Sequence, residues 1–375
     1  MTKLKELIQE LCPDGVEFCP LEQCCNILDR KRKPVTKSAR EAGDYPYYGA
    51  NGIQDYVSDY IFDGTFILVG EDGSVITDRG TPVVTWASGK IWVNNHAHII
   101  EESGGVLLRY LYHYIQTINV SPLIHGNIPK LTGGDFKALQ IPVPPLPVQR
   151  EIVRILDNFT ELTAELTAEL TARKQQYEYY RNRLLTFDVR GGGTSRTEWR
   201  MFGETCFLQA GKAIDAESIS KEKTLEYCIP CYGGNGLRGY VRKANQKGEK
   251  PLVGRQGALC GNVCFAKGDY YATEHAVVVT DRGFYNSRFL YHLLVNKNLN
   301  QYKTAGAQPG LSVTKLETIL LPVPEMEIQN RIADVLDNFD VICTDLNIGL
   351  PAEIEARKKQ YEYYRDKLLT FTPAD

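Results

Sequence analysis

The sequence predicts an α+β fold built from one unit used twice: two strand-rich domains joined by two long helices that pack as an antiparallel coiled coil. Three observations carry this prediction. A motif in the middle of the 375-residue chain returns near its end. Short alternating apolar runs with many glycines and tyrosines, typical of strands and turns, precede each copy. Each copy also lies in a stretch with apolar residues three or four apart, which indicates an amphipathic helix.

The repeat is closest in the helical stretches. Residues 173–187 (RKQQYEYYRNRLLTF) return as residues 357–371 (RKKQYEYYRDKLLTF), with 12 of 15 positions identical at an offset of 184. Upstream, the stretch 141–159, which begins IPVP and ends LDNF, returns as 321–339 at an offset of 180. The second copy therefore has four extra residues between these motifs. A repeat this long indicates a duplicated architecture.

The domains that precede the helices are duplicated as well. Three pairs of stretches match: YPYYGANGIQDYV (45–57) with IPCYGGNGLRGYV (229–241), LVGEDGSV (68–75) with LVGRQGAL (252–259), and NNHA (94–97) with TEHA (273–276). Glycines and apolar residues are kept, whereas Glu71 and Asp72 become Arg255 and Gln256. Two related scaffolds that read different ligands would show this contrast.

Proline clusters set the expected domain boundaries. Pro142 to Pro147, and Pro322 with Pro324, favour an extended segment before a helix that begins at or just after the last proline. We therefore expect strand-rich domains at 1–146 and 188–324, and helical regions at 147–187 and 325–371.

Each helix has one apolar seam, the row of side chains that should meet the other helix. The seam residues predicted to form the coiled coil or to meet a partner are Leu162, Leu166, Leu170, Tyr177, Tyr180, Leu184, Leu346, Ile354, Tyr361, Tyr364 and Leu368. Two nearly identical seams in one chain favour packing against each other. The alternative is that each helix packs only on its own domain. Gly349 and Pro351 predict a break in the second helix that the first helix lacks.

Composition limits the class of protein. The net charge is −3 and the pI is near 6.1, which argues against binding nucleic acid by bulk charge alone. Local basic runs, Arg30 to Arg40 and Arg238 to Arg255, could still neutralise phosphates. No stretch approaches the length of a membrane span, and the first residues lack the apolar core of a secretory signal. The cytoplasm is the expected location.

The ten cysteines do not predict a disulfide framework in a chain without an export signal. Cys228, Cys231, Cys260 and Cys264 could in principle supply four zinc thiolates. The favoured interpretation is that they are small apolar residues in strands, because the first domain matches these stretches without cysteines. We expect no metal site.

Motifs for catalysis are missing. Gly234, Gly236 and Gly239 form a lone G-x-G-x-x-G, but strand-like sequence follows it, so a dinucleotide fold is not expected. The chain has neither a phosphate-binding G-x-x-x-x-G-K-[ST] loop nor an Asn/Asp-Pro-Pro-aromatic motif of amino-methyltransferases. His96 and His275 occupy matching positions, yet neither has a paired nucleophile or metal set, so a structural role or a ligand contact is favoured.

Taken together, these motifs resemble the specificity subunit of a type I restriction-modification system. The resemblance runs along the whole chain: the opening CPDGVEF (12–18), the Y-G-x-N-G turns, the L-V-G-x-x-G loops, the LDNF segments and the R-K-x-Q-Y-E-Y-Y-R helices follow that family's order of recognition domain, conserved region, recognition domain and conserved region.

The resemblance implies a function and a set of partners. Each recognition domain would read one half of a split sequence in double-stranded DNA, while the helices would fix the gap and dock two modification subunits. Those subunits would use S-adenosylmethionine to methylate adenine at N6, and restriction subunits would use ATP and Mg²⁺ to cut unmodified DNA. This chain would be non-catalytic, would carry neither cofactor and would not contact a membrane.

Candidate DNA-contacting residues come from the duplicated loops. They are Tyr48, Asn51, Glu71, Asp72, Ser74, His96 and Lys130 in the first domain, and Tyr232, Asn235, Arg255, Gln256, His275, Gln308 and Ser312 in the second. Arg255 suits a guanine edge and Gln256 an adenine edge. The paired tyrosines and asparagines could instead serve turn formation around Gly52 and Gly236.

Two other classes of function stay open from the sequence. The chain could be a stand-alone DNA enzyme with an unrecognised site, in which case the isolated chain would show turnover. It could also be a non-catalytic coiled-coil scaffold that joins modules which do not bind nucleic acid, and then it would show no sequence preference on DNA.

Overall fold

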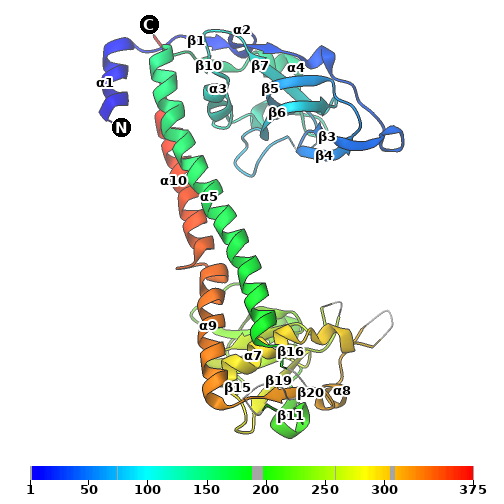
Figure 1. Ribbon diagram of the computed structural model, residues 1–375. Helices are drawn as coiled ribbons and strands as arrows, with labels where there is room; N and C mark the ends of the chain where they lie inside the picture. Colours follow the sequence, from blue (N-terminus) through cyan, green and yellow to red (C-terminus); the bar gives the residue numbers. More distant parts are fainter. Residues whose placement is uncertain (1, 74, 188–196, 258, 305–308, 375) are drawn as a thin grey trace. The chain divides into compact units, whose positions relative to one another are not determined.

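The computed structural model describes residues 2–73, 75–187, 197–257, 259–304 and 309–374 (Figure 1). The chain divides into two compact units, one formed by Met1–Leu166 with Ile354–Asp375 and the other by Thr167–Glu353. Each unit therefore contains one strand-rich domain, one part of the long helix α5 (Leu146–Leu184) and one helix of the C-terminal repeat.

A six-stranded sheet forms the centre of the first unit. Its order is β2-β7-β5-β6-β3-β4, and its strands pair antiparallel except β3 and β6, which are parallel. The strands are β2 (Cys25–Ile27), β3 (Ala42–Gly49), β4 (Gly52–Val57), β5 (Phe62–Gly70), β6 (Val84–Val93) and β7 (Ala97–Glu102). Two short antiparallel pairs join β1 (Phe18–Pro20) to β10 (Gln140–Pro142) and β8 (Ile124–His125) to β9 (Lys130–Leu131).

Both faces of this sheet are buried, as strand β5 shows. Ile67 and Val69 belong to one apolar cluster, and Phe66 and Leu68 belong to another. Successive side chains of a strand point to opposite faces, so each cluster lies on its own side of the sheet. The helices of this unit outside the C-terminal repeat and α5 are α1 (Thr2–Leu11), α2 (Leu21–Cys24), α3 (Leu108–Ile115) and α4 (Gly133–Lys137).

The second unit repeats this plan with smaller sheets. One four-stranded sheet has the order β12-β19-β16-β17, another has the order β14-β13-β18-β15, and β11 pairs with β20. The strands are β11 (Glu198–Met201), β12 (Cys206–Ala210), β13 (Ile229–Gly233), β14 (Gly236–Val241), β15 (Gln246–Lys247), β16 (Lys250–Gly254), β17 (Val263–Ala266), β18 (Asp269–Ala272), β19 (Ala276–Asp281) and β20 (Leu320–Val323). Its short helices are α6 (Phe202–Thr205), α7 (Ser287–Asn296) and α8 (Val313–Glu317).

The Y-G-x-N-G motifs form matching hairpins in the two domains. Gly52 and Gly236 both have φ of 91°, a left-handed conformation that favours glycine and explains why this letter is kept. The register shifts just before Tyr48 in one hairpin and just before Tyr232 in the other. Each tyrosine then pairs in parallel with a strand of its own domain. The predicted duplication of the domains is therefore confirmed in the backbone.

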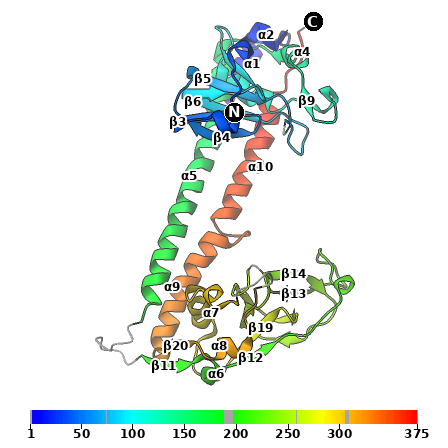
Figure 2. The same cartoon turned by 90° about the vertical axis from the view of Figure 1, so that its right-hand side faces the viewer.

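The predicted packing of the two helical repeats is also confirmed within each unit. In the first unit, α10 (Leu350–Leu368) runs beside the first part of α5 in the opposite direction, and Phe159 stacks on Tyr364 at 5.3 Å between ring centroids (Figures 1 and 2). In the second unit, Tyr177 and Tyr180 of α5 lie against Phe339 of α9 (Met326–Thr344). The alternative that each helix packs only on its own domain is wrong, because α5 contributes to both units.

The predicted break in the second helix lies between Thr344 and Leu350. Its cause is local, since the Asp345 carboxylate accepts the backbone N–H groups of Asn347 and Ile348 and so replaces helical bonds. Leu346 lies in this break and is 79% exposed, so it is not packed in the seam, and its contact with a partner stays a prediction.

The other predicted seam residues differ in how deeply they are buried. Ile354 and Leu368 are buried, whereas Leu162 is 43% exposed. The seam therefore packs less tightly at Leu162 than at these two positions of α10.

A buried histidine joins the domain to both helices in each unit. In the first unit His113 of α3 contacts the Asp157 carboxylate through Nε2 at 2.9 Å and the Tyr361 hydroxyl through Nδ1 at 2.9 Å. Arg109 donates to the same carboxylate at 2.7 Å. Three elements, α3, α5 and α10, therefore meet at one fully buried ring.

The second unit repeats this network with equivalent residues. His292 of α7 contacts Asp337 at 2.6 Å and the Tyr177 hydroxyl at 3.3 Å, and Arg288 donates to Asp337 at 2.8 Å. Burial lowers the pKa of both histidines. A neutral ring that donates from Nε2 and accepts at Nδ1 satisfies both contacts.

Removing this carboxylate should destabilise the second unit. We expect Asp337→Ala to lower the free energy of unfolding by about 2 kcal/mol, because the buried His292 and the Arg288 guanidinium lose a charged hydrogen-bond partner. Urea unfolding checks this. The neighbouring, exposed Asn338→Ala is the control, and equal midpoints for the two variants would contradict the prediction.

The same histidines should make stability depend on pH. Because the folded pKa is lowered, their contribution is complete above the ordinary value of 6.5 and is lost as the pH falls below it, when the unfolded chain takes up protons first. Between about pH 7.5 and pH 5.5 we expect the urea midpoint of the natural chain to fall more than that of the His113→Gln, His292→Gln double variant. Parallel pH profiles for the two proteins would refute the assignment.

Candidate nucleic-acid interface

Three loop segments meet in the same way in each recognition domain. In the first domain the backbone N–H of Glu71 donates to His96 O at 2.9 Å, and Gly73 N–H donates to Pro129 O at 3.0 Å. In the second domain Arg255 N–H donates to His275 O at 2.9 Å, and Gly257 N–H donates to Pro309 O at 3.1 Å. The backbone frame is therefore shared, and the side chains on it differ.

Glu71 is held by internal partners in the first domain. Its carboxylate pairs with Arg32 at 2.6 Å and with Lys130 at 3.2 Å, and its side chain is only 12% exposed. Arg32 also bonds the backbone of Ala97 at 2.7 Å. The acceptors of Glu71 thus hold the loops together in the free chain, and its contact with DNA stays a prediction.

His98 lies at the inner end of this ion-pair network. Its Nδ1 lies 2.6 Å from Asp29 Oδ2, its Nε2 lies 3.1 Å from Leu131 O, and its ring stacks on Phe136. Both ring nitrogens therefore face oxygen atoms of the same domain, which fixes the orientation of the ring. Burial favours a raised pKa for Asp29, but the bond from His98 dominates together with Ile99 N–H and Arg32, so the pKa of that carboxyl is lowered.

Among the described residues, this network also contains a group of side chains whose spacing could hold a metal ion. Ligand atoms of Asp29, Glu71 and His98 lie within 4.8 Å of one another, and Arg32 already pairs with both carboxylates. Across the described residues, the four cysteines considered for zinc do not gather into such a group: Cys228 is exposed, Cys231 is buried in β13, and Cys260 is buried in the turn between β16 and β17.

The side chains left open on the first domain are Asp72, His96 and Asn51. The Asp72 carboxylate accepts a hydrogen bond from His96 Nδ1, and this imidazole is 47% exposed. Asn51 lies exposed at the tip of the β3–β4 hairpin. Lys130 is 46% exposed beside them.

Two more candidates of the first domain cannot be placed on this surface. Tyr48 is 7% exposed within an apolar cluster, and burial raises the pKa of its hydroxyl, so its contact with DNA stays a prediction that this arrangement does not favour. Its ring packs the hairpin onto the sheet instead. Ser74 lies outside the described residues.

The second domain has a hollow where the first has its ion pairs. The cavity, of about 470 Å³, is lined by Gly234, Asn235, Gln256, Gly257, His275, Pro309 and Gly310. Gly310 bridges to Gln256 as Lys130 bridges to Asp72 in the first domain, so a residue without a side chain replaces a lysine. The missing side chain leaves this space open.

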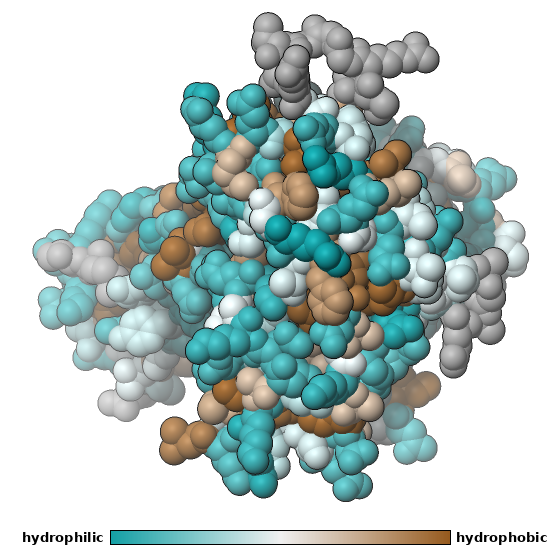
Figure 3. Space-filling view, turned by 90° about the horizontal axis from the view of Figure 1, so that it is seen from below, coloured by the Kyte–Doolittle hydropathy of each residue, from teal (hydrophilic) through white to brown (hydrophobic). Residues whose placement is uncertain are grey.

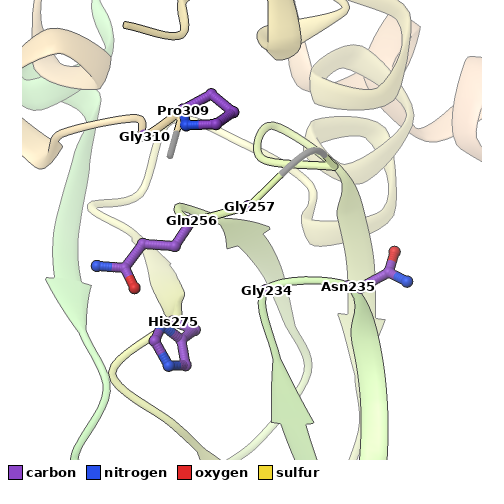
Figure 4. Close-up of a pocket in the computed structure, with 7 residues that line it drawn as sticks. All are labelled: Gly234, Asn235, Gln256, Gly257, His275, Pro309 and Gly310. Carbon is purple, nitrogen blue, oxygen red and sulfur yellow. The ribbon is translucent and has the colours of Figure 1, made fainter. Parts of the chain in front are cut away.

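Figure 4 shows how the side chains of this hollow are directed. Gln256 and His275 lie on the same side of the loops, whereas Asn235 points away from them. Asn235 also lines a neighbouring hollow with Asn262 and Asn300. The structure therefore brings Gln256 and His275 together and separates Asn235 from them.

The remaining candidates of the second domain have different surroundings. Arg255 is half-buried and its Nε lacks a hydrogen-bond partner in the described part of the chain. Tyr232 packs edge-to-face on Tyr270. The Ser312 hydroxyl accepts Lys315 N–H at 3.1 Å and caps α8, so it serves the fold first. Gln308 lies outside the described residues.

The basic runs are only partly available to a ligand. Arg40 pairs with Asp55 and lies over the ring of Tyr47. In the first run the exposed cations are Arg30, Lys31, Lys33 and Lys37. Figure 3 shows hydrophobic residues as small areas among hydrophilic ones on the face it presents. Among the described helices, none combines the length and apolarity required to cross a membrane.

Sequence reasoning missed the histidines that matter most to the architecture. His113 and His292 follow a repeated R-x-L-Y-H pattern at residues 109–113 and 288–292, and this repeat could have identified them. His98 has no such signal, because the equivalent position in the second domain is Val277.

A family model for the type I restriction modification DNA specificity domain matches residues 13–173 and, a second time, residues 198–356. The chain belongs to this family. It is a type I restriction-modification specificity subunit with two recognition domains, as the resemblance implied, and its role is DNA target recognition.

Curated relatives agree with this assignment. The chain is 34% identical to the putative type I restriction enzyme specificity subunit S.HindORF215P of Haemophilus influenzae over 392 aligned positions, which cover 95% of this chain and 96% of that protein. It is 48% identical over 225 residues to the EcoprrI specificity subunit of Escherichia coli, covering 56% and 55% of the two chains.

Solved structures show the same fold at low sequence identity. The S subunit from M. genitalium superposes with a TM-score of 0.65 at 16% identity, covering 95% of this chain and 96% of that chain. A chain from work on complex assembly and conformational transition of the type I restriction-modification system has a TM-score of 0.54 at 15% identity, covering 95% and 98%.

The ion-pair network of the first domain should be essential to its stability. We expect Asp29→Ala to lower the free energy of unfolding of the first unit by about 3 kcal/mol, because His98 and Arg32 then stay buried with one anion fewer. Urea unfolding measures this, with the exposed Asp44→Ala as the control. A loss within 0.5 kcal/mol, roughly the spread of neutral surface substitutions, would contradict the role given to the network.

Proposed function

We propose that this chain is the non-catalytic reader of a two-part target in double-stranded DNA, with one half-site read by each recognition domain. In this proposal its helices dock two modification subunits, and restriction subunits join that assembly. S-adenosylmethionine, ATP and Mg²⁺ belong to those partners, and this chain holds none of them.

The observation that carries the proposal is the shared loop frame with different side chains. The bonds from Glu71 and Gly73 in one domain have the same geometry as those from Arg255 and Gly257 in the other. Constant backbone with variable polar side chains is suited to reading base edges, because the frame sets register and the side chains select bases.

Each domain offers a different set of groups to a base edge. In the first domain the Asp72 carboxylate can accept from a cytosine amino group, and His96 lies beside it. In the second domain the Gln256 amide can pair with both N6 and N7 of adenine. The two half-sites should therefore differ in sequence.

Two related readers in one chain support a split target. Binding at one half-site raises the effective concentration of the second reader, so two modest interactions act together. Local cations such as Lys31 and Lys33 supply contacts to phosphates. A few such contacts allow a domain that is nearly neutral to bind the DNA backbone.

Mapping N6-methyladenine in cells that express this chain with its modification subunits tests the proposal. We expect a methylated motif with two specified parts and an unspecified gap. A continuous motif would overturn the proposal, as would methylation without sequence preference, which the scaffold alternative predicts. Turnover by the isolated chain on DNA with a methyl donor would support the stand-alone enzyme instead.

Gln256→Ala should relax one half-site and leave the other unchanged. Loss of a bidentate contact costs about 1–3 kcal/mol of discrimination, so we expect roughly tenfold less preference at one base pair. Methylation of a randomised DNA library by the assembled complex measures this. Gln209→Ala, an exposed glutamine on β12 outside the loop frame, is the matched control, and an unchanged motif for Gln256→Ala would exclude this residue.

A further inference from the structure

Matching segments of the two recognition domains carry opposite charge. In each domain a crossover segment, residues 28–41 in the first and 211–228 in the second, leads into the hairpin with the Y-G-x-N-G turn. The first crossover segment holds 6 basic and 2 acidic residues, and the second holds 3 basic and 4 acidic ones. The hairpin segments reverse this order: residues 45–59 hold 2 acidic residues and no basic one, and residues 229–243 hold 3 basic residues and no acidic one. The positive charge therefore lies on the crossover segment in one domain and on the hairpin in the other.

The aligned hairpin positions show where the charge changes. The hairpin segments align without a gap, because they extend the matched stretches 45–57 and 229–241 by two residues. The pairs that change are Gln54 with Arg238, Asp55 with Gly239, Ser58 with Arg242 and Asp59 with Lys243. Arg238, Arg242 and Lys243 are all exposed, and we call these three residues the hairpin cations.

An ion pair joins each hairpin to the crossover segment of its own domain, and its polarity is reversed between the domains. In the first domain Arg40 of the crossover segment donates to the Asp55 carboxylate of the hairpin at 3.2 Å. In the second domain Arg242 of the hairpin lies 3.1 Å from the Glu226 carboxylate of the crossover segment. The contact between the two segments is thus kept while its charges are exchanged.

The cations of these ion pairs differ in how free they are to bind a ligand. Arg40 is 15% exposed and lies over the ring of Tyr47, so it belongs to the packing of the first domain. Arg242 is 58% exposed and Glu226 is 65% exposed, and such an exposed pair contributes little to stability. Arg242 can therefore exchange this carboxylate for a phosphate at little cost.

Other exposed cations of the first crossover segment and of the second hairpin form no ion pair with a described residue. They are Arg30, Lys31, Lys33 and Lys37 in the first domain, and Arg238 and Lys243 in the second. These side chains are available to an anionic ligand.

Both cationic segments lie next to the loop frame of their own domain. In the first domain Arg32 of the crossover segment pairs with Glu71 of the frame at 2.6 Å. Its neighbours Lys31 and Lys33 are exposed. In the second domain Asn235, at the tip of the hairpin, lines the hollow of the frame. Contacts to phosphates from these places would set the position of the loops that meet base edges.

We propose that the two recognition domains hold the phosphate backbone of DNA through different elements, the first through its crossover segment and the second through the hairpin cations. The inference rests on the proposed function and goes beyond it. The shared loop frame alone would place the same backbone contacts in both half-sites, whereas the charges place them on different elements. The first hairpin segment holds only acidic charges and cannot supply the contacts that the second one supplies.

The salt dependence of DNA binding tests this inference on the complex of this chain with its modification subunits. The probe is a DNA duplex that contains the methylated motif, and each phosphate contact adds about 0.9 to the slope of log Kd against log salt concentration. Two triple variants each remove three charges: Arg238→Gln with Arg242→Ser and Lys243→Gln, and Lys31→Gln with Lys33→Gln and Lys37→Gln. We expect each variant to lower the slope by about 2.7. The methylated motif should keep both specified parts, because phosphate contacts do not select bases.

The matched control removes three exposed cations from the second crossover segment, in the variant Lys212→Gln with Lys221→Gln and Lys223→Gln. It changes the charge of the second domain as much as the hairpin variant does. We expect its slope to stay within about 0.5 of the natural value, less than one contact. Urea midpoints equal to that of the natural chain show that the variants fold.

Four results would overturn the inference. They are an unchanged slope for either triple variant, a control slope that falls as far as that of the hairpin variant, a change in the bases of the motif, and loss of modification subunits from the purified hairpin variant. In the last case the hairpin cations would contact protein. Each of these results leaves the two-part motif of the natural complex, and hence the proposed function, intact. A natural complex that methylates no two-part motif would overturn the proposed function as well.

Discussion

The buried histidine of each unit is the contact on which the architecture depends. His113 joins α3 to Asp157 of α5 and to Tyr361 of α10, and His292 joins α7 to Asp337 and Tyr177 in the same way. A neutral ring has one donor and one acceptor, so it can hold two different helices only if each offers the complementary group. Here the conserved LDNF and YEYYR motifs supply those groups, which explains why both motifs are kept in both copies.

The domains use a constant frame to carry different chemistry. Backbone bonds fix the loops after β5 and β16 and the loops before β7 and β19 in the same geometry. In the first domain four charged groups and His98 fill the space beneath these loops, whereas in the second domain Gly310 leaves a hollow beside Gln256 and His275. Stability of the loops and chemistry at their surface are therefore supplied by different atoms.

The sequence predicted the structure correctly where the signal was a residue type with a local effect on the backbone. Gly52 and Gly236 predicted matching turns, and Gly349 with Pro351 predicted the helix break. It did not foresee contacts between residues distant in sequence. Glu71 pairs with Arg32, 39 positions away, and nothing in the repeat marks that pair. Leu346 kept the helical spacing across the break, because spacing alone does not register that Asp345 has ended the helix.

These couplings limit how a recognition loop can change. An arginine at position 71, as the second domain has at position 255, would face Arg32 and Lys130 with only Asp29 to balance them. In the second domain the equivalents of His98 and Lys130 are Val277 and Gly310, so the whole set differs together. Like charges in a buried site cost folding free energy. The loop residues and the charged residues beneath them must therefore be exchanged as a group. The unit that carries specificity is therefore the domain with its buried network, and not the exposed residues alone.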